Sequence, residues 1–313
     1  MIQPVYNQDT DLQFDHSKDE LKLKRSDTLD AEAYKVRQQD KINVRNLFRN
    51  FYRSKLDVGI GLQRAHGSVL AGDSFELIRL PDSSCLFIFT DVSGHGLPAY
   101  TTLIRLRSAI SIAVKNLRKT YVENSSIDTA YLIQNIVENF TDIMEDANTN
   151  DFACVNFTVI TEEDNCFRLK FYNRSMLFPI VVRTENNNVK LINLNNEYLD
   201  WIPNKSFLLG PDIRKLVGEK YNHTPECEFM FKEGDSLLYY SDGIIEACPD
   251  DPEQEDGFGE QRLEKALIEN ATLFPQVVVD EVISMVYEYI GTSVQQKDDM
   301  TAVMINFPVS SNK

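Results

Sequence analysis

Segments with strand-like patterns cluster along this chain instead of alternating with single helices, and this order limits the folds open to it. Three strand patterns come first and two helical patterns follow. A long run of strands then precedes two more helices and a last strand. A doubly wound parallel sheet needs regular alternation, so the order favours antiparallel sheet layers covered by helices.

The individual elements follow from apolar spacing and from residues that favour helix starts. Leu103, Leu106, Ile110 and Ala113 step by three and four, which predicts a helix with one buried face, and Pro98 suits its first turn. Strands are expected at 57–65, 69–79, 85–91, 152–160, 166–173, 177–183, 188–194, 227–231, 236–241 and 300–307. Helices are expected at 97–119, 127–145, 258–270 and 275–291, and residues 204–227 are expected to form a long irregular segment or flap.

The charge of the chain argues against two classes of partner. The formal net charge is −16 at pH 7, which disfavours nucleic acid and anionic membrane surfaces. Residues 1–53 hold 10 Lys and Arg against 9 Asp and Glu, whereas the remainder holds 22 against 39. The acidity therefore belongs to the main domain, where it suits a solvated surface.

The expected location is the cytoplasm. The chain has no run of eighteen apolar residues, and its first residues lack the basic start and apolar core of a signal peptide. Its five cysteines are scattered without CxxC spacing, which is typical of reduced thiols and excludes the usual zinc patterns. We expect no membrane insertion.

A helical pattern precedes the main domain. Val44, Leu47, Phe48 and Phe51 fall on one helical face. This stripe could pack on its own domain, pair with a second copy in a homodimer, or continue a signalling helix. The predicted domains are a 1–54 extension that regulates or dimerises, a main domain at 55–308 and a tail at 309–313.

Aspartates at strand ends are the chemically informative feature of the main domain. The sequence LPDSS can close a hairpin in which Arg79 faces Cys85 and Asp73 faces Asp91. Asp242 ends a strand, and Asp298 and Asp299 precede the last one. Converging carboxylates repel one another unless a cation lies between them, and Mg²⁺ and Mn²⁺ prefer such oxygen ligands. Each motif alone is more often a turn, but together they predict a two-metal site in which Asp91 bridges and the Val92 carbonyl assists.

Five motifs carry a resemblance to a known family. They are AGDSFEL, TDVSGHGLPA, YYSDGIIEA, GFGEQRL and DDMTAVMI, in that order. They resemble the metal-dependent protein phosphatases of the 2C class (PPM type), most of all the bacterial SpoIIE-type branch, over about residues 55–308. The resemblance implies an α+β fold, a four-layer αββα sandwich of two antiparallel sheets flanked by helices.

The resemblance also implies a reaction and a set of ligands. Family members hydrolyse phosphoserine or phosphothreonine on proteins with two Mn²⁺ or Mg²⁺ ions. By motif, the metal ligands would be Asp73, Asp91, the Val92 carbonyl, Asp242 and Asp298, with Asp299 as an accessory ligand or a support. The implied partner is a phosphorylated regulatory protein, for example a small regulator of the anti-anti-sigma type. The alternatives are a non-catalytic binding module with the same fold and a small-molecule phosphoesterase.

Several residues depart from the family pattern or leave their roles open. Ala71 stands where a glycine is usual, Glu76 where an aspartate is usual, and Arg174 with Ser175 replaces a glycine-histidine-proline turn. His95 could protonate the leaving oxygen or merely hold its turn. Arg64, Arg79 and Arg174 are weak candidates for contacts with the substrate phosphate.

Overall fold

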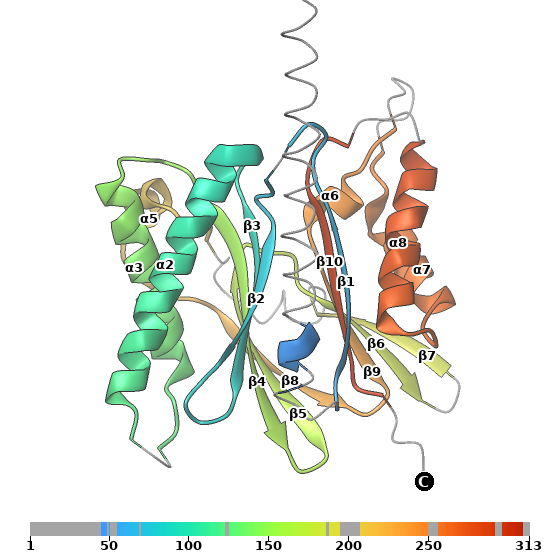
Figure 1. Cartoon of the computed structure of the whole chain (residues 1–313), viewed down its shortest axis with the longest axis horizontal. Coiled ribbons are helices and arrows are strands. Elements are labelled where there is room, and N and C mark those ends of the chain that lie inside the picture. The colour runs from blue at the N-terminus through green and yellow to red at the C-terminus, as the bar shows by residue number, and fades with distance from the viewer. Residues whose placement is uncertain are drawn as a thin grey trace, which may run out of the picture. The chain divides into compact units, whose positions relative to one another are not determined.

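Two antiparallel sheets stack face to face in the computed structural model (Figure 1). The structure describes residues 45–48, 50, 55–68, 70–122, 125–185, 188–194, 207–249, 256–291 and 296–308. Contacts divide the chain into Met1–Gln39 and Asp40–Lys313, and all described residues belong to the second unit.

Each sheet has five strands. The first sheet has the order β1 (Asp57–Gln63), β10 (Met300–Asn306), β9 (Asp235–Tyr240), β6 (Ile180–Glu185) and β7 (Asn188–Asn193). The second has the order β2 (Ser74–Arg79), β3 (Cys85–Val92), β4 (Ala153–Glu163), β5 (Cys166–Arg174) and β8 (Glu226–Lys232). β1 and β2 are therefore edge strands, one in each sheet.

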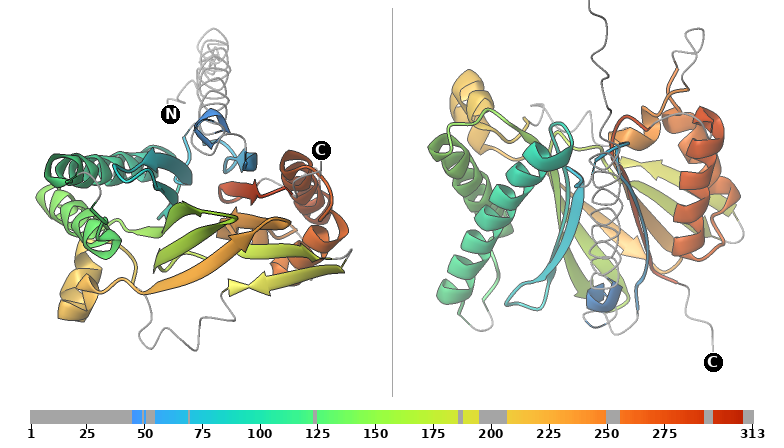
Figure 2. Two further views of the ribbon diagram at one scale, coloured as in Figure 1. Left: turned by 90° about the horizontal axis from the view of Figure 1, so that it is seen from below. Right: turned by 45° about the horizontal axis from the view of Figure 1, so that its top comes forward.

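Helix pairs cover the outer faces of the two sheets (Figures 1 and 2). α2 (Gly96–Thr120) and α3 (Thr129–Asp146) pack on the second sheet, whereas α7 (Gly259–Glu269) and α8 (Pro275–Ile290) pack on the first. Because α3 starts at an aspartate, the Asp128 side chain caps it by accepting from the Tyr131 N–H at 2.9 Å. Three apolar layers result, one between the sheets and one under each helix pair. The predicted αββα sandwich is confirmed.

The element predictions hold with three corrections. The segment predicted to be irregular contains α5 (Pro211–Val217) and a 3₁₀ helix, η1 (Gly218–Asn222). β2 begins at Ser74 rather than at residue 69. Asp242 does not simply end a strand, because it opens the one-turn helix α6 (Asp242–Ile245). These helices are too short to show an amphipathic period in the sequence.

Phe48 from the predicted N-terminal stripe is a core residue. Residues 45–48 are helical, and Phe48 is fully buried in the apolar layer between the sheets. Its ring centroid lies 5.9 Å from that of Phe87 on β3, and Leu47 packs partly against the same layer. Val44 and Phe51 lie outside the described residues, so the rest of the stripe and a boundary at residue 54 stay predictions.

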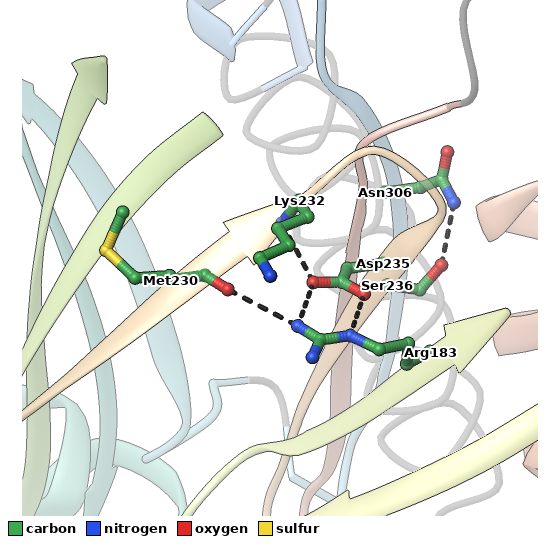
Figure 3. Close-up of polar contacts among 6 residues, drawn as sticks. All are labelled: Arg183, Met230, Lys232, Asp235, Ser236 and Asn306. Carbon is green, nitrogen blue, oxygen red and sulfur yellow. Dashed lines mark hydrogen bonds and ion pairs between the residues drawn. The ribbon is translucent and has the colours of Figure 1, made fainter. Parts of the chain in front are cut away.

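An ion pair between the partly exposed Arg183 of β6 and the buried Asp235 joins two strands of the first sheet where β9 begins (Figure 3). Arg183 Nε and Nη2 donate to the two carboxylate oxygens of Asp235 at 2.7 and 2.8 Å. The backbone N–H of Lys232 also donates to this carboxylate at 2.8 Å. A bidentate pair with a further donor satisfies a buried charge well, so this contact secures the β8–β9 turn at the strand end opposite Asp242.

Two expectations from composition can be compared with the described residues. All five cysteines are free, as the scattered spacing predicted. No helix in the described ranges combines the length and the apolar character that crossing a membrane requires.

The burial of Phe48 yields a stability prediction. Phe48→Ala should lower the free energy of unfolding by about 3–5 kcal/mol, because truncating a buried phenylalanine loses packing and leaves a cavity. Urea denaturation of the full chain measures this change. Asn46→Ala, an exposed residue of the same turn, is the matched control and should change the value by less than about 0.5 kcal/mol. Equal effects of the two variants would show that the helix is not part of the core.

Candidate metal centre

The predicted aspartates come from strand ends of both sheets. β2 and β3 pair from Ser74–Thr90 to Arg79–Cys85, which confirms the predicted hairpin register. One residue beyond this ladder, Asp73 lies opposite Asp91. In the first sheet, β9 and β10 pair through Tyr240 and Ala302, and the Ser241 N–H donates to the Thr301 carbonyl at 3.0 Å. Asp242 and Asp298 therefore lie near the same ends of these two strands.

Electrostatic interactions show that the two sheets bring these carboxylates together. The pKa of Asp91 is raised to about 10, first by burial and then by the charges of Asp73, Asp242 and Asp298. Burial raises the pKa of Asp73 well above its usual value, and repulsion from Asp299 and Asp242 adds to this, although the Thr301 and Ser241 hydroxyls oppose it. Asp91 thus interacts with aspartates of both sheets.

Asp298 is the more open member of this group. Its side chain is exposed, yet partial burial and repulsion from Asp242 and Asp299 raise its pKa. The Asp299 backbone N–H and the charge of His95 act in the opposite direction. Asp298 Oδ1 accepts from that N–H at 2.7 Å. One of its two oxygens is therefore already oriented by the turn before β10.

Asp299 has a different environment from Asp298. Its side chain is buried, Oδ1 accepts from the Ala65 N–H at 2.9 Å, and Oδ2 accepts from the Gly72 N–H at 2.7 Å. Both oxygens thus hold the segment that connects β1 to β2. Of the two roles predicted for Asp299, this geometry favours support of the ligands over direct ligation.

Two glycines allow the backbone to pack closely at the site. A Cβ on Gly72 would lie 2.9 Å from the Val92 carbonyl oxygen, and one on Gly243 would lie 2.1 Å from the Asp299 carbonyl oxygen. Gly243 follows Asp242, so the Asp-Gly pair is needed for the approach of α6 to the start of β10. The Val92 carbonyl in turn lies close to the backbone that carries Asp73.

His95 lies at the N-cap position of α2, and its side chain is exposed. Its Nδ1 is 3.0 Å from Ser68 Oγ, and Arg64 Nη1 donates to the Ser68 carbonyl at 2.7 Å. Arg64 therefore supports the loop that holds His95. The contact with Ser68 leaves the other ring nitrogen, Nε2, for any role in proton transfer.

Arg79 and Arg174 are not placed to bind a substrate phosphate beside the aspartates. Arg79 lies at the end of β2 opposite to Asp73. Arg174 is fully buried, its Nη1 donates to the carbonyls of Tyr221 and His223 at 2.8 and 3.1 Å, and its guanidinium stacks on the Tyr221 ring. Arg174 anchors the η1 segment to β5, so we withdraw both arginines as phosphate contacts.

Three residues near the aspartates were not identified from the sequence. Cys154 lies opposite Asp91 in the β3–β4 ladder, and burial together with the nearby aspartates raises the pKa of its thiol to about 12. Burial and the charges of Asp242 and Asp298 raise the pKa of Glu246. Ser68 contacts His95. Only Cys154 had a usable signal, because the β3–β4 register would have placed it beside Asp91.

The donor set at this site suits hard divalent cations in its chemistry. Among the described residues, no three His, Cys, Asp or Glu side chains already converge as a metal cage. However, Asp73 is only 5% exposed, and its buried Oδ2 has no hydrogen-bond partner in the described part of the chain. It lies beside carboxylates that raise its pKa. A cation satisfies such an oxygen and removes the repulsion, so this set of oxygen donors fits the ligand preference of Mg²⁺ or Mn²⁺.

Comparisons with known proteins agree with this fold. A family model described as stage II sporulation protein E (SpoIIE) matches residues 81–308. No curated protein matches the chain. The structure is similar to the SiaA-PP2C domain of Pseudomonas aeruginosa, with a TM-score of 0.61 and 15% identity, covering 91% of this chain and 98% of that one.

Two further solved structures share the architecture. The RsbU and RsbW domains of a Mycobacterium tuberculosis protein match with a TM-score of 0.53 and 18% identity, covering 81% of this chain and 61% of that one. The phosphatase domain of SpoIIE from Bacillus subtilis, solved with a fragment of its regulatory domain, matches with a TM-score of 0.54 and 17% identity, covering 80% and 63%. The chain therefore belongs to the SpoIIE family and has the fold of the PP2C-type phosphatases.

Proposed function

We propose that this chain is a protein serine/threonine phosphatase that depends on two Mn²⁺ or Mg²⁺ ions. The observation that carries the proposal is the group of carboxylates from both sheets. Within the described ranges Asp73 Oδ2 has no hydrogen-bond partner, and Asp91 is repelled by three other aspartates. Family membership supports the same reaction class. When bound, such ions would activate a water molecule and neutralise charge on the phosphoryl group.

Residues of the chain would bind the ions, support the ligands and donate a proton. Asp73, Asp91, Asp242, Asp298 and the Val92 carbonyl would hold the ions. Asp91 would be the ligand shared between them, because it interacts with aspartates of both sheets. Asp299 would hold the backbone that carries Asp73. His95, exposed beside Asp298, would donate a proton to the serine or threonine oxygen that leaves the phosphate.

The proposed substrate is a phosphorylated regulatory protein in bacterial signalling, of the small anti-anti-sigma type, and the proposed location is the cytoplasm. The SpoIIE family and the similarity to an RsbU domain support this class of partner. A homodimer stays a further prediction. Turnover of both a phosphopeptide and p-nitrophenyl phosphate would support the proposal, whereas metal binding without turnover would indicate a non-catalytic binding module. Turnover limited to small esters would indicate a small-molecule phosphoesterase.

Asp91→Asn should reduce phosphatase activity without lowering the stability of the metal-free protein. We expect phosphopeptide hydrolysis to fall more than about 100-fold, because even residues that only support a metal ligand contribute about 10–100-fold. In chelator the variant should melt no lower than the wild type, because an amide cannot ionise and so avoids the free-energy cost of protonating this carboxyl on folding. Hydrolysis assays and thermal melts measure the two effects. Half of the wild-type rate in this variant would contradict the assignment of Asp91.

The raised carboxyl pKa values give a pH dependence with a definite sign. A carboxyl whose pKa rises on folding contributes stability below its unfolded pKa of about 4, and that contribution is lost as pH rises towards the folded pKa, about 10 for Asp91. In chelator, the free energy of unfolding should therefore fall between pH 5 and 9. Each proton retained only by the folded state contributes a slope of about 1.4 kcal/mol per pH unit.

Added Mn²⁺ should reverse this slope, because the cation competes with protons and stabilises the folded state by mass action. Denaturant titrations at several pH values, with chelator and with Mn²⁺, measure both slopes. Asp73→Asn combined with Asp91→Asn should flatten the metal-free slope. The same slope with and without Mn²⁺ would show that the carboxylates do not bind it.

The two roles considered for His95 can be distinguished by the leaving group. A serine oxygen needs a proton as it leaves, whereas p-nitrophenolate leaves readily without one. A general acid contributes about 10²–10⁴-fold, so His95→Gln should slow phosphopeptide hydrolysis by about 100-fold or more and p-nitrophenyl phosphate hydrolysis far less. Equal losses for both substrates would mean that His95 only holds its turn through Ser68. Ser68→Ala provides the comparison, since it removes that contact and leaves the imidazole present.

A further inference from the structure

Asp73 lies between two residues that contact α2. On one side, Gly72 packs so closely on the first turn of α2 that an added Cβ would lie 3.2 Å from the Ala99 Cβ. On the other side, Ser74 Oγ accepts a hydrogen bond from Arg107 Nη2 of α2 at 2.9 Å. The residues on both sides of Asp73 therefore contact the same helix. This helix covers the outer face of the second sheet (Figures 1 and 2).

Arg107 makes a second contact on β2. Its Nε forms an ion pair with Glu76, and both side chains are about one-third exposed or less, at 35% and 27%. Ser74 and Glu76 are two residues apart on a strand, so they lie on the same face, towards α2. Arg107 thus contacts two successive side chains on the face of β2 that points towards α2. The glutamate that departs from the family pattern is one of the two groups that it holds.

Asp73 points away from Arg107. Phe75 and Leu77 lie in the apolar layer between the sheets. Side chains alternate along a strand, so Asp73, two residues before Phe75, is on the same side as these two. The charges that shift the pKa of Asp73 are aspartates of the site, with burial as the largest cause. Any influence of Arg107 on Asp73 therefore passes through the backbone of β2.

This backbone needs a tether for two reasons. β2 is an edge strand that pairs only with β3, and Asp73 precedes the first ladder pair, Ser74–Thr90. Its neighbour across the hairpin is Asp91, which repels it. An unpaired strand start with a repelled carboxylate tends to move away from the site. The Thr301 and Ser241 hydroxyls act on the Asp73 side chain itself. The backbone beside it is held by the Asp299–Gly72 hydrogen bond on one side and by the Arg107–Ser74 hydrogen bond on the other.

We propose that Arg107 is a positioning residue for the metal ligand Asp73: by holding Ser74 and Glu76 against α2, it keeps Asp73 where a divalent cation can bind. This inference rests on the proposed function.

The chain offers a matched control for this proposal. Arg118, also on α2, donates from Nη2 to the Arg79 carbonyl at 3.0 Å. Both arginines therefore join α2 to β2, but Arg118 does so at the end of the strand far from Asp73. A general loss of packing between helix and strand should follow from removing either arginine, whereas a loss of metal affinity should follow only from removing Arg107.

The experiment is a calorimetric titration of the full-length protein with Mn²⁺ alone, together with the thermal shift that Mn²⁺ produces. Arg107→Met should weaken Mn²⁺ binding by about 10-fold or more, the size of effect found for residues that support a ligand. At saturating Mn²⁺ its kcat should stay within a few-fold of wild type. Ser74→Ala should reproduce part of the loss, and Arg107→Lys should lie between, since it keeps the charge but not the guanidinium fork. Arg118→Met should bind Mn²⁺ as the wild type does.

The outcomes separate this inference from the proposed function. If the wild type binds Mn²⁺ and Arg107→Met binds it equally well, Arg107 has no positioning role and the proposed function stands. If Arg118→Met weakens binding as much as Arg107→Met, helix packing in general is responsible and the inference is wrong. If Arg107→Met does not fold, the Mn²⁺ titrations of Ser74→Ala and Arg107→Lys test the inference instead. Weaker binding in both supports it, and wild-type binding in both contradicts it. If the wild type does not bind Mn²⁺, and Asp73→Asn gives the same titration as the wild type, the proposed function is overturned instead.

Discussion

Asp73, Asp91, Asp242 and Asp298 repel one another at one end of the sandwich, and the rest of the structure has to hold them there. Two of them come from each sheet, so no single hairpin brings them together. The stacking of the sheets does so, driven by an apolar layer that includes Phe87, Phe89 and Tyr239 from facing strands. Burial first, and then the charges of the other aspartates, raise the pKa of Asp91 to about 10. A fold that confines like charges in this way gains most from a bound cation.

Helix α2 links the parts of this site more directly than any other element. The strand before it, β3, ends at Val92, whose carbonyl closely approaches Gly72, and the N-cap residue of α2 is His95. Further along the helix, Arg107 contacts Ser74 and Glu76. The end of β3, the cap and the middle of α2 thus all lie near the backbone around Asp73 and Asp91. The buried face of α2 fixes the helix on the second sheet, which makes its position a property of the apolar core as well as of the site.

The sequence was most informative where one local pattern decides the structure. Alternating and i, i+4 apolar spacing located the strands and the long helices, and the LPDSS turn predicted the register that places Asp73 opposite Asp91. Local pattern cannot reveal α5, η1 or α6, whose few residues take their conformation from tertiary contacts such as Arg174 with the Tyr221 carbonyl. The same limit applies to Arg79 and Arg174, because residue type suggested phosphate binding whereas position and burial decide against it.

Asp298 and Asp299 show why the ligand assignment needs the fold. They are adjacent and chemically identical, and the sequence assigns both to the metal site. In the structure both Asp299 oxygens accept backbone N–H groups from the segment between β1 and β2, whereas Asp298 remains exposed and its pKa is raised by neighbouring aspartates. The two N–H donors satisfy both carboxylate oxygens of Asp299 by hydrogen bonding. Asp299 therefore serves the fold, and Asp298 is the member of the pair that we propose as a metal ligand. The distinction arises from the path of residues 65–72, which no local pattern encodes.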